Sequence, residues 1–243
     1  MKKYCCLASI LLILSACSGD KPETIQQEAD SQQPADSLKI AVSDPQTEIM
    51  KPSLGIGVVG IKFNDKTIVR FYDEPIEKNP VKIIRFFDDK VTNGWNIADL
   101  EEQEKWMKPE VLWLDYSFFF FRCTEKQGNW FKVIVNNDSG KSYWIKKDTQ
   151  RVFSDWKTFL SGMFSVERIP DYPQKIHSNP SDDTPEMPYE GADCFEVKSM
   201  QGNWIEISST DNCDETDTVH PIRSGWIKWR NKDRLMIKYY LLS

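Results

Sequence analysis

The chain has 243 residues, of which 28% are charged and 12% aromatic, and its formal net charge is −6. This length allows one or two domains of ordinary size. An acidic balance disfavours nucleic acid and anionic lipid as main partners, because both require clustered cations.

The first segment predicts export. Lys2 and Lys3 precede an apolar run over 7–14, which is far shorter than the roughly 20 residues of a membrane-spanning helix. A basic start, a short apolar run and small residues before a cut site are typical of a secretory signal. Residues 14–17, Leu-Ser-Ala-Cys, resemble the bacterial lipobox, although an ordinary signal with an incidental cysteine is the alternative. We expect 1–16 to be a signal peptide and Cys17 to carry lipid.

This resemblance places the protein in the cell envelope of a Gram-negative bacterium, as an outer-membrane lipoprotein whose acylated Cys17 holds it to the membrane. The face it occupies, periplasmic or surface, is left open. Residues 17–50 are rich in Gln, Asp, Ser, Glu and Pro and contain no aromatic residue, so they predict a flexible tether. Within the tether, Asp36-Ser37-Leu38 resembles an O-glycosylation sequon of some Gram-negative bacteria, with Ser37 as the acceptor.

An internal repeat follows the tether. Gln-Gly-Asn-Trp occurs at 127–130 and again at 201–204, and a second match pairs Trp144-Ile145-Lys146 with Trp226-Ile227-Lys228. From there the two copies align without a gap to 161 and 243. Each copy predicts strand, tight turn and strand, because apolar residues alternate after a Gly-Asn pair that tolerates positive φ. The expected structural anchors are Gly128, Asn129, Trp130, Trp144, Gly202, Asn203, Trp204 and Trp226.

The first copy carries an insertion over about 93–112. Its residues 96–107 predict a short amphipathic helix, with Ile97, Leu100, Trp106 and Met107 on the inner side. The second copy instead lengthens the loop 208–223, which is acidic. Its carboxylates could offer oxygen ligands to calcium, but the simpler interpretation is a solvated acidic loop.

Gly-Asn-Trp, a variable loop and Trp-Ile-Lys resemble the second half of a bacterial SH3-like (SH3b) domain. The stretches 69–75 and 175–180 resemble its opening strand and turn. The resemblance implies an all-β fold with two tandem SH3-like small barrels, at 51–161 and 162–243, the first with the helical insertion. It also implies binding of cell-wall peptides or docking of cell-wall enzymes.

The aromatic residues admit two interpretations. The paired tryptophans are expected to pack in the core or hairpins, and Trp130→Ala or Trp204→Ala to unfold its module. A ligand groove of aromatic side chains is the alternative. Its candidates, which have a polar tip or an exposed context, are Tyr72, Tyr143, Tyr189 and Trp229.

No constellation for catalysis is expected, and no cofactor or metal site. The two histidines, His177 and His220, lack a metal-binding spacing. Cys123 and Cys194 lie in apolar surroundings and predict buried small side chains. A disulfide between Cys194 and Cys213 is the alternative for Cys194. The sequence therefore predicts a non-enzymatic envelope lipoprotein that binds cell-wall peptide or glycan, or a protein partner. The alternatives are a purely structural assembly lipoprotein and an unrecognised hydrolase.

Overall fold

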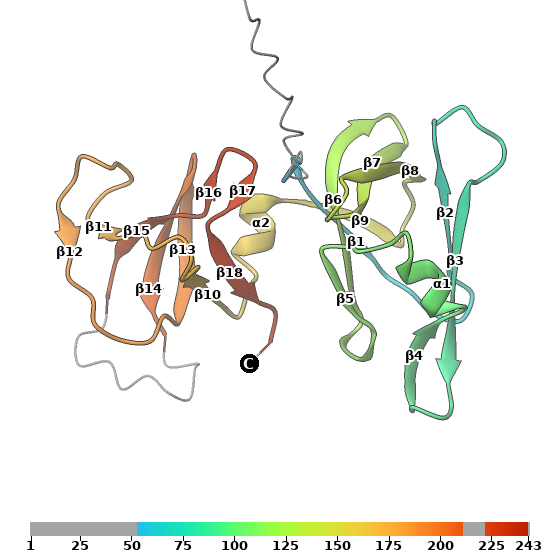
Figure 1. The fold of residues 1–243 in the computed structure, drawn as a ribbon, viewed down its shortest axis with the longest axis horizontal. Coiled ribbons are helices and arrows are strands. Elements are labelled where there is room, and N and C mark those ends of the chain that lie inside the picture. Colours follow the sequence, from blue (N-terminus) through green and yellow to red (C-terminus); the bar gives the residue numbers. More distant parts are fainter. Residues whose placement is uncertain (1–52, 211–221, 243) are drawn as a thin grey trace, which may run out of the picture. The chain divides into compact units, whose positions relative to one another are not determined.

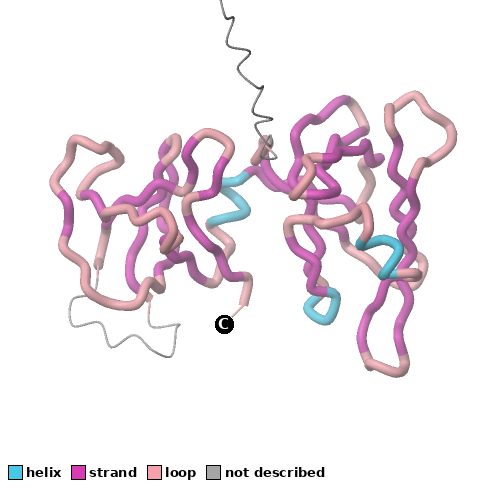
Figure 2. The backbone as a smooth tube through the Cα atoms, in the orientation of Figure 1, coloured by secondary structure: helices cyan, strands magenta, loops and turns pink. Residues whose placement is uncertain are grey.

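A computed structural model describes residues 53–210 and 222–242. The expected signal peptide 1–16, the tether 17–50 with Cys17 and Ser37, and most of the acidic loop with Cys213 and His220 lie outside these ranges. Within them, no helix is both long and apolar enough to cross a bilayer. Strand is the dominant structure and helix is confined to short segments (Figure 2), so the all-β prediction is confirmed.

Residues 57–155 form one curled antiparallel sheet (Figure 1). Its strands are β1 (Gly57–Ile61), β2 (Ile68–Tyr72), β3 (Lys82–Asp89), β4 (Gly94–Ile97), β5 (Val111–Trp113), β6 (Phe118–Gln127), β7 (Trp130–Asn136), β8 (Lys141–Lys146) and β9 (Arg151–Asp155). They lie in the order β4-β3-β2-β8-β7-β6-β1-β9, and β5 pairs with β6.

Residues 165–240 form a second curled sheet. Its strands are β10 (Ser165–Arg168), β11 (Ile176–His177), β12 (Glu186–Met187), β13 (Phe195–Gln201), β14 (Trp204–Ser209), β15 (Gly225–Lys228) and β18 (Ile237–Tyr240). A separate hairpin pairs β16 (Arg230–Asn231) with β17 (Arg234–Leu235). The order β12-β11-β15-β14-β13-β10-β18 repeats the path β3-β2-β8-β7-β6-β1-β9 of the first sheet.

The register of the two sheets agrees with the sequence repeat. Trp130 lies opposite Lys146 and Trp204 opposite Lys228. The front halves also correspond, because Tyr72 and His177 lie opposite the second tryptophan of their copies. The turn glycines Gly128 and Gly202 have φ of +53° and +59°, which favours glycine over residues with a Cβ.

The sequence prediction that the two copies align without a gap from the second tryptophan to 161 and 243 is wrong. Val59 of β1 lies opposite Phe153, whereas the corresponding Val166 of β10 lies opposite Tyr239. Phe153 therefore corresponds to Tyr239 rather than to Leu235. The β16–β17 hairpin accounts for the difference, since it lengthens the second copy between β15 and its last strand.

Each sheet contributes a hydrophobic core. The first is made by residues of β1–β8 and the insertion, with Phe71, Phe121 and Val133 at its centre. The second contains Phe195, Ile205 and Ile227, and also Leu54, Val58 and helix α2 (Trp156–Leu160). The Trp156 indole N–H donates to the Leu54 carbonyl oxygen at 3.1 Å. Segments that the sequence assigns to the first module thus pack against the core of the second, within the compact unit 47–243.

The insertion differs from the predicted helix over 96–107. Its helix α1 spans only Leu100–Glu104, because β4 pairs with β3 and Asp99 then adopts a left-handed φ of 55°. The 3-10 turn η1 (Leu114–Tyr116) follows β5. The expected inner side is nevertheless apolar and covered, since Ile97 and Met107 are buried and Leu100 and Trp106 pack against the first core.

Candidate functional site

The four residues of the predicted aromatic groove are not assembled into one surface. Tyr143 is 8% exposed and belongs to the first core, and Trp229 is 2% exposed and belongs to the second. The indole N–H of Trp229 donates to the Gly202 carbonyl oxygen at 3.0 Å. The prediction that these two side chains face a ligand groove is therefore wrong, since both are enclosed by their own modules.

The other two groove candidates lie apart in the fold. Tyr72 is half-buried on β2, where its ring meets the Trp130 ring edge-on at 5.2 Å. Tyr189 lies in the second module, and its hydroxyl donates to the Ala192 carbonyl oxygen at 2.8 Å. Burial raises the pKa of Tyr189, and its ring lies under the Arg168 guanidinium at 5.8 Å.

The anchor tryptophans lie on the outer sides of the strands. Trp130 and Trp204 alternate with the core residues Phe131 and Ile205, so they face away from the cores and are half-buried. Of the two predicted places, core or hairpin, the core is wrong for Trp130 and Trp204, because the buried positions of each strand begin one residue later. Trp144, on the outer side of β8, is buried, whereas Trp226 is half-buried.

The insertion of the first module encloses a pocket of about 600 Å³, here called the insertion pocket. Its walls come from the β3–β4 turn, β4, α1, β5 and η1, and they are lined by Thr92, Trp95, Asn96, Leu100, Glu104, Leu112, Trp113, Leu114, Asp115 and Tyr116. Trp113 and Tyr116 are 45% and 63% exposed. Two aromatic rings therefore present apolar surface to solvent at an open cavity.

Two carboxylates of the insertion pocket have no partner among the described residues. The side chains of Glu104 and Asp115 make no hydrogen bond or ion pair there. Asp115 lies close to β4, since a Cβ added at Gly94 would stand 2.7 Å from its Oδ1 atom. Aromatic rings beside free carboxylates form a site suited to a cationic group, because both attract positive charge.

The backbone around the insertion pocket is unusual. Asn93, Asp99 and Ser117 have φ between 55° and 60°, the left-handed region that residues with a Cβ rarely adopt. These residues flank β4, α1 and η1, so they set the turns that close the pocket. Such conformations cluster at binding sites more often than elsewhere.

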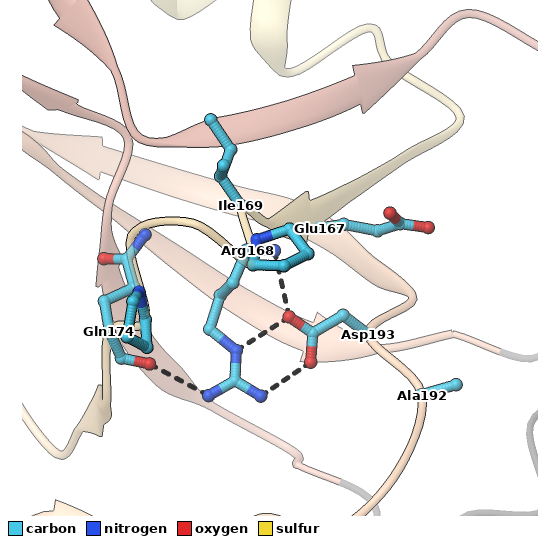
Figure 3. A pocket seen from close by; sticks show the side chains of 8 residues that line it. Glu167, Arg168, Ile169, Gln174, Ala192 and Asp193 are labelled. Carbon is cyan, nitrogen blue, oxygen red and sulfur yellow. Dashed lines mark hydrogen bonds and ion pairs between the residues drawn. The ribbon is translucent and has the colours of Figure 1, made fainter.

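A second pocket, of about 440 Å³, lies beside β10 in the second module (Figure 3). Here the Arg168 guanidinium donates to both carboxylate oxygens of Asp193, each at 2.7 Å, and to the Gln174 carbonyl oxygen at 3.0 Å. The Arg168 backbone N–H also donates to Asp193. These bonds raise the pKa of Arg168 and occupy both charged groups, so this pocket is a clamp between β10 and the 188–193 loop.

Sequence reasoning found none of the insertion pocket's aromatic residues. Part of the signal for this site was present in the sequence, because comparison of the two copies identified 93–112 as an insertion in the first copy. Trp95 comes close to Trp113 and Tyr116 because β4 contacts η1. That contact depends on the strand pairings of the folded sheet.

Two described groups that could support catalysis, His177 and Cys123, are engaged structurally. His177 packs against the Trp204 ring, and its Nδ1 atom lies 3.2 Å from the Thr184 carbonyl oxygen. Burial raises the pKa of the Cys123 thiol to about 11, so it is a poor nucleophile. Over 53–210 and 222–242, no cluster of three His, Cys, Asp or Glu side chains could hold a metal ion.

Cys194 is buried, as the sequence predicted. It is disulfide-bonded, whereas Cys123 is a free thiol. The alternative of a Cys194–Cys213 disulfide concerns Cys213, which lies outside the described residues.

Comparison with known proteins gives no relative from which a function could be transferred. No protein-family model, no curated protein and no solved structure matches the chain.

Proposed function

We propose that this chain is an exported, lipid-anchored protein of the Gram-negative envelope that binds cell-wall fragments without catalysis. It would use two tandem SH3-like modules, the first with its insertion. Two features support the tandem assignment: the shared strand order of the two sheets and the matched register of their hairpins. The lipobox at 14–17 supports the anchor.

The observation that carries the binding function is the insertion pocket. Its volume of about 600 Å³ lies within the range of small-ligand sites. Its exposed Trp113 and Tyr116 rings can pack on an apolar or cationic ligand. Glu104 and Asp115 can accept hydrogen bonds from an ammonium group. These features favour a cell-wall peptide with a free amine over a bare glycan strand.

A titration of the full chain with a cell-wall tetrapeptide, followed by tryptophan fluorescence, tests this function. Trp113→Ala/Tyr116→Ala should weaken binding about fivefold or more, since a cation–π contact at an exposed site contributes about 0.5–1 kcal/mol and two rings are lost. Glu104→Gln/Asp115→Asn should weaken it too, because the carboxylates lose their charge. N-acetylation of the peptide amine should have the same effect.

The control is Tyr172→Ala, which removes an exposed aromatic ring outside the insertion pocket. Equal binding by the acetylated and the free peptide would contradict the amine assignment. Binding of a glycan strand without peptide would show that the sugar, and not the amine, is the recognised group. If no fragment binds, while an envelope protein copurifies in a manner that depends on Trp113 and Tyr116, the assembly alternative would replace this proposal.

The anchor has its own test. Cys17→Ala should leave unprocessed precursor and abolish partitioning into the detergent phase, because the acyl chains supply the membrane affinity. Metabolic labelling with a fatty-acid analogue measures the modification directly. Labelling that persists in Cys17→Ala would place the lipid elsewhere.

A further inference from the structure

The first sheet carries a second feature, on the outer side of four neighbouring strands. Alternate residues of a strand point to the same face, and the register places Tyr72 opposite Trp144 and Trp144 opposite Lys132. By the same alternation this face holds Arg70, Arg85, Trp130 and Lys146. We call these seven residues the basic face. It shares no residue with the insertion pocket.

The cations of the basic face lack acidic partners among the described residues. Arg70, Arg85 and Lys146 are exposed, and none of them forms an ion pair there. Lys132 is half-buried and lies over the Trp144 ring at 5.6 Å. One acid lies at the edge of this face, Glu125 on β6, opposite Lys132. Asp73, next to Tyr72 in the chain, lies 3.8 Å from Lys141. Four cations are thus gathered on one side of a chain that is acidic overall.

In the second sheet, the cations at the corresponding positions are neutralised by acidic partners. Lys175 and Lys228, which correspond to Arg70 and Lys146, form ion pairs with Glu186 and Asp182 at 2.5 and 2.6 Å. Glu206 stands where the first sheet has Lys132, since each lies opposite the second tryptophan of its copy. The excess of cations is therefore a property of the first module rather than of the repeated fold.

We propose that the basic face binds an acidic polysaccharide. Carboxylates or sulfates along the polymer complement the four cations, and sugar rings can pack on the partly exposed Tyr72 and Trp130. A neutral ligand would leave the cations unused. The choice of a polysaccharide among polyanions rests on the proposed export, whereas the surface itself does not depend on the insertion pocket.

Binding of polygalacturonate to the full chain in non-ionic detergent tests this proposal, with dextran as the neutral polymer. Arg70→Glu/Lys146→Glu reverses two exposed charges and should weaken binding of polygalacturonate about tenfold or more. The matched control is Lys175→Glu/Lys228→Glu, at the corresponding positions of the second sheet, and it should bind like the unmodified chain. Salt of roughly 0.5 M should weaken binding, because it shortens the range of charge attraction.

Lys132→Gln gives a second variant that reverses no charge and should weaken binding by a smaller factor. Trp113→Ala/Tyr116→Ala should leave polygalacturonate binding unchanged, which separates this proposal from the insertion pocket. Equal binding of dextran would overturn it, as would equal losses in the two charge-reversal variants. Binding only to phosphatidylglycerol nanodiscs, or only to single-stranded DNA, would also overturn it, because the partner would then be a lipid surface or a nucleic acid.

Discussion

Tyr143→Ala is expected to lower the free energy of unfolding by about 3–5 kcal/mol, the usual cost of removing a large buried aromatic side chain. The ring is 8% exposed, and its centroid lies 6.3 Å from that of Phe71 and 6.2 Å from that of Trp106. Its removal would leave a cavity between the sheet and the insertion. Urea denaturation, followed by circular dichroism, measures the loss.

Tyr72→Ala is the matched control, because Tyr72 is a half-buried tyrosine on the outer side of the adjacent strand. It should cost only about 1 kcal/mol, mainly through the lost contact with Trp130. Trp130→Ala should likewise cost less than Tyr143→Ala, in contrast to the sequence prediction that it unfolds the module. If Tyr143→Ala proved no more costly than Tyr72→Ala, the assignment of inner and outer faces would be reversed.

Glu110→Ala is expected to cost about 3–5 kcal/mol, since it leaves a buried charge without its partner. The Glu110 side chain is 5% exposed and accepts a hydrogen bond from the Arg122 Nε atom at 2.5 Å. It also accepts from the Asn137 amide at 2.8 Å and from the Tyr239 hydroxyl at 2.5 Å. Tyr239 belongs to β18, so this network ties the first sheet to the last strand of the second.

Glu167→Ala is the control, because Glu167 accepts a similar bond from the Tyr240 hydroxyl but lines a pocket at the surface. Its loss should be about 1 kcal/mol. Thermal unfolding of both variants provides the comparison. Equal costs would mean that the Glu110 network is solvated and not a structural tie between the modules.

Alkaline unfolding gives a second measure of the same network. Burial raises the pKa of Tyr239 far above its usual range, and burial with the Glu167 bond raises that of Tyr240 to about 12. The folded state therefore holds these protons at a pH where the unfolded chain, with a tyrosine pKa of about 10, has lost them. The contribution of these two tyrosines to the free energy of unfolding is fully present below a pH of about 10 and is lost as the pH rises further. Tyr239→Phe should flatten this fall.

The sequence by itself determined the repeated part of this protein. The Gly-Asn turns and the alternation after them predicted the two hairpins, because a tight turn with positive φ and a period of two are local properties of the chain. The sequence also predicted that 69–75 corresponds to 175–180, because both stretches resemble the opening strand and turn of an SH3-like domain. The front half and the hairpin of each copy then pair in the same register.

The tertiary structure alone decided which side of each strand is covered. Tyr143 was predicted to line a ligand groove, yet it lies in the first core. Gly225, at the corresponding position of the second copy, is also enclosed. A Cβ there would stand 2.4 Å from the Ile176 side chain and 3.2 Å from Ile222. In the first core this space is filled by the Tyr143 ring. In the second core it is filled by the side chains around Gly225. Burial depends on what non-local elements bring against a position, so identical hairpins can carry different residues on the same inner face.

The insertion pocket and the basic face have the same origin. Trp95, Trp113 and Tyr116 meet only when β4 joins β3 and η1 follows β5, and the four cations of the basic face come from separate strands that pair across the sheet. An overall charge of −6 gave no sign of that cluster, because net charge sums over the chain whereas a binding surface depends on which side chains the register places together.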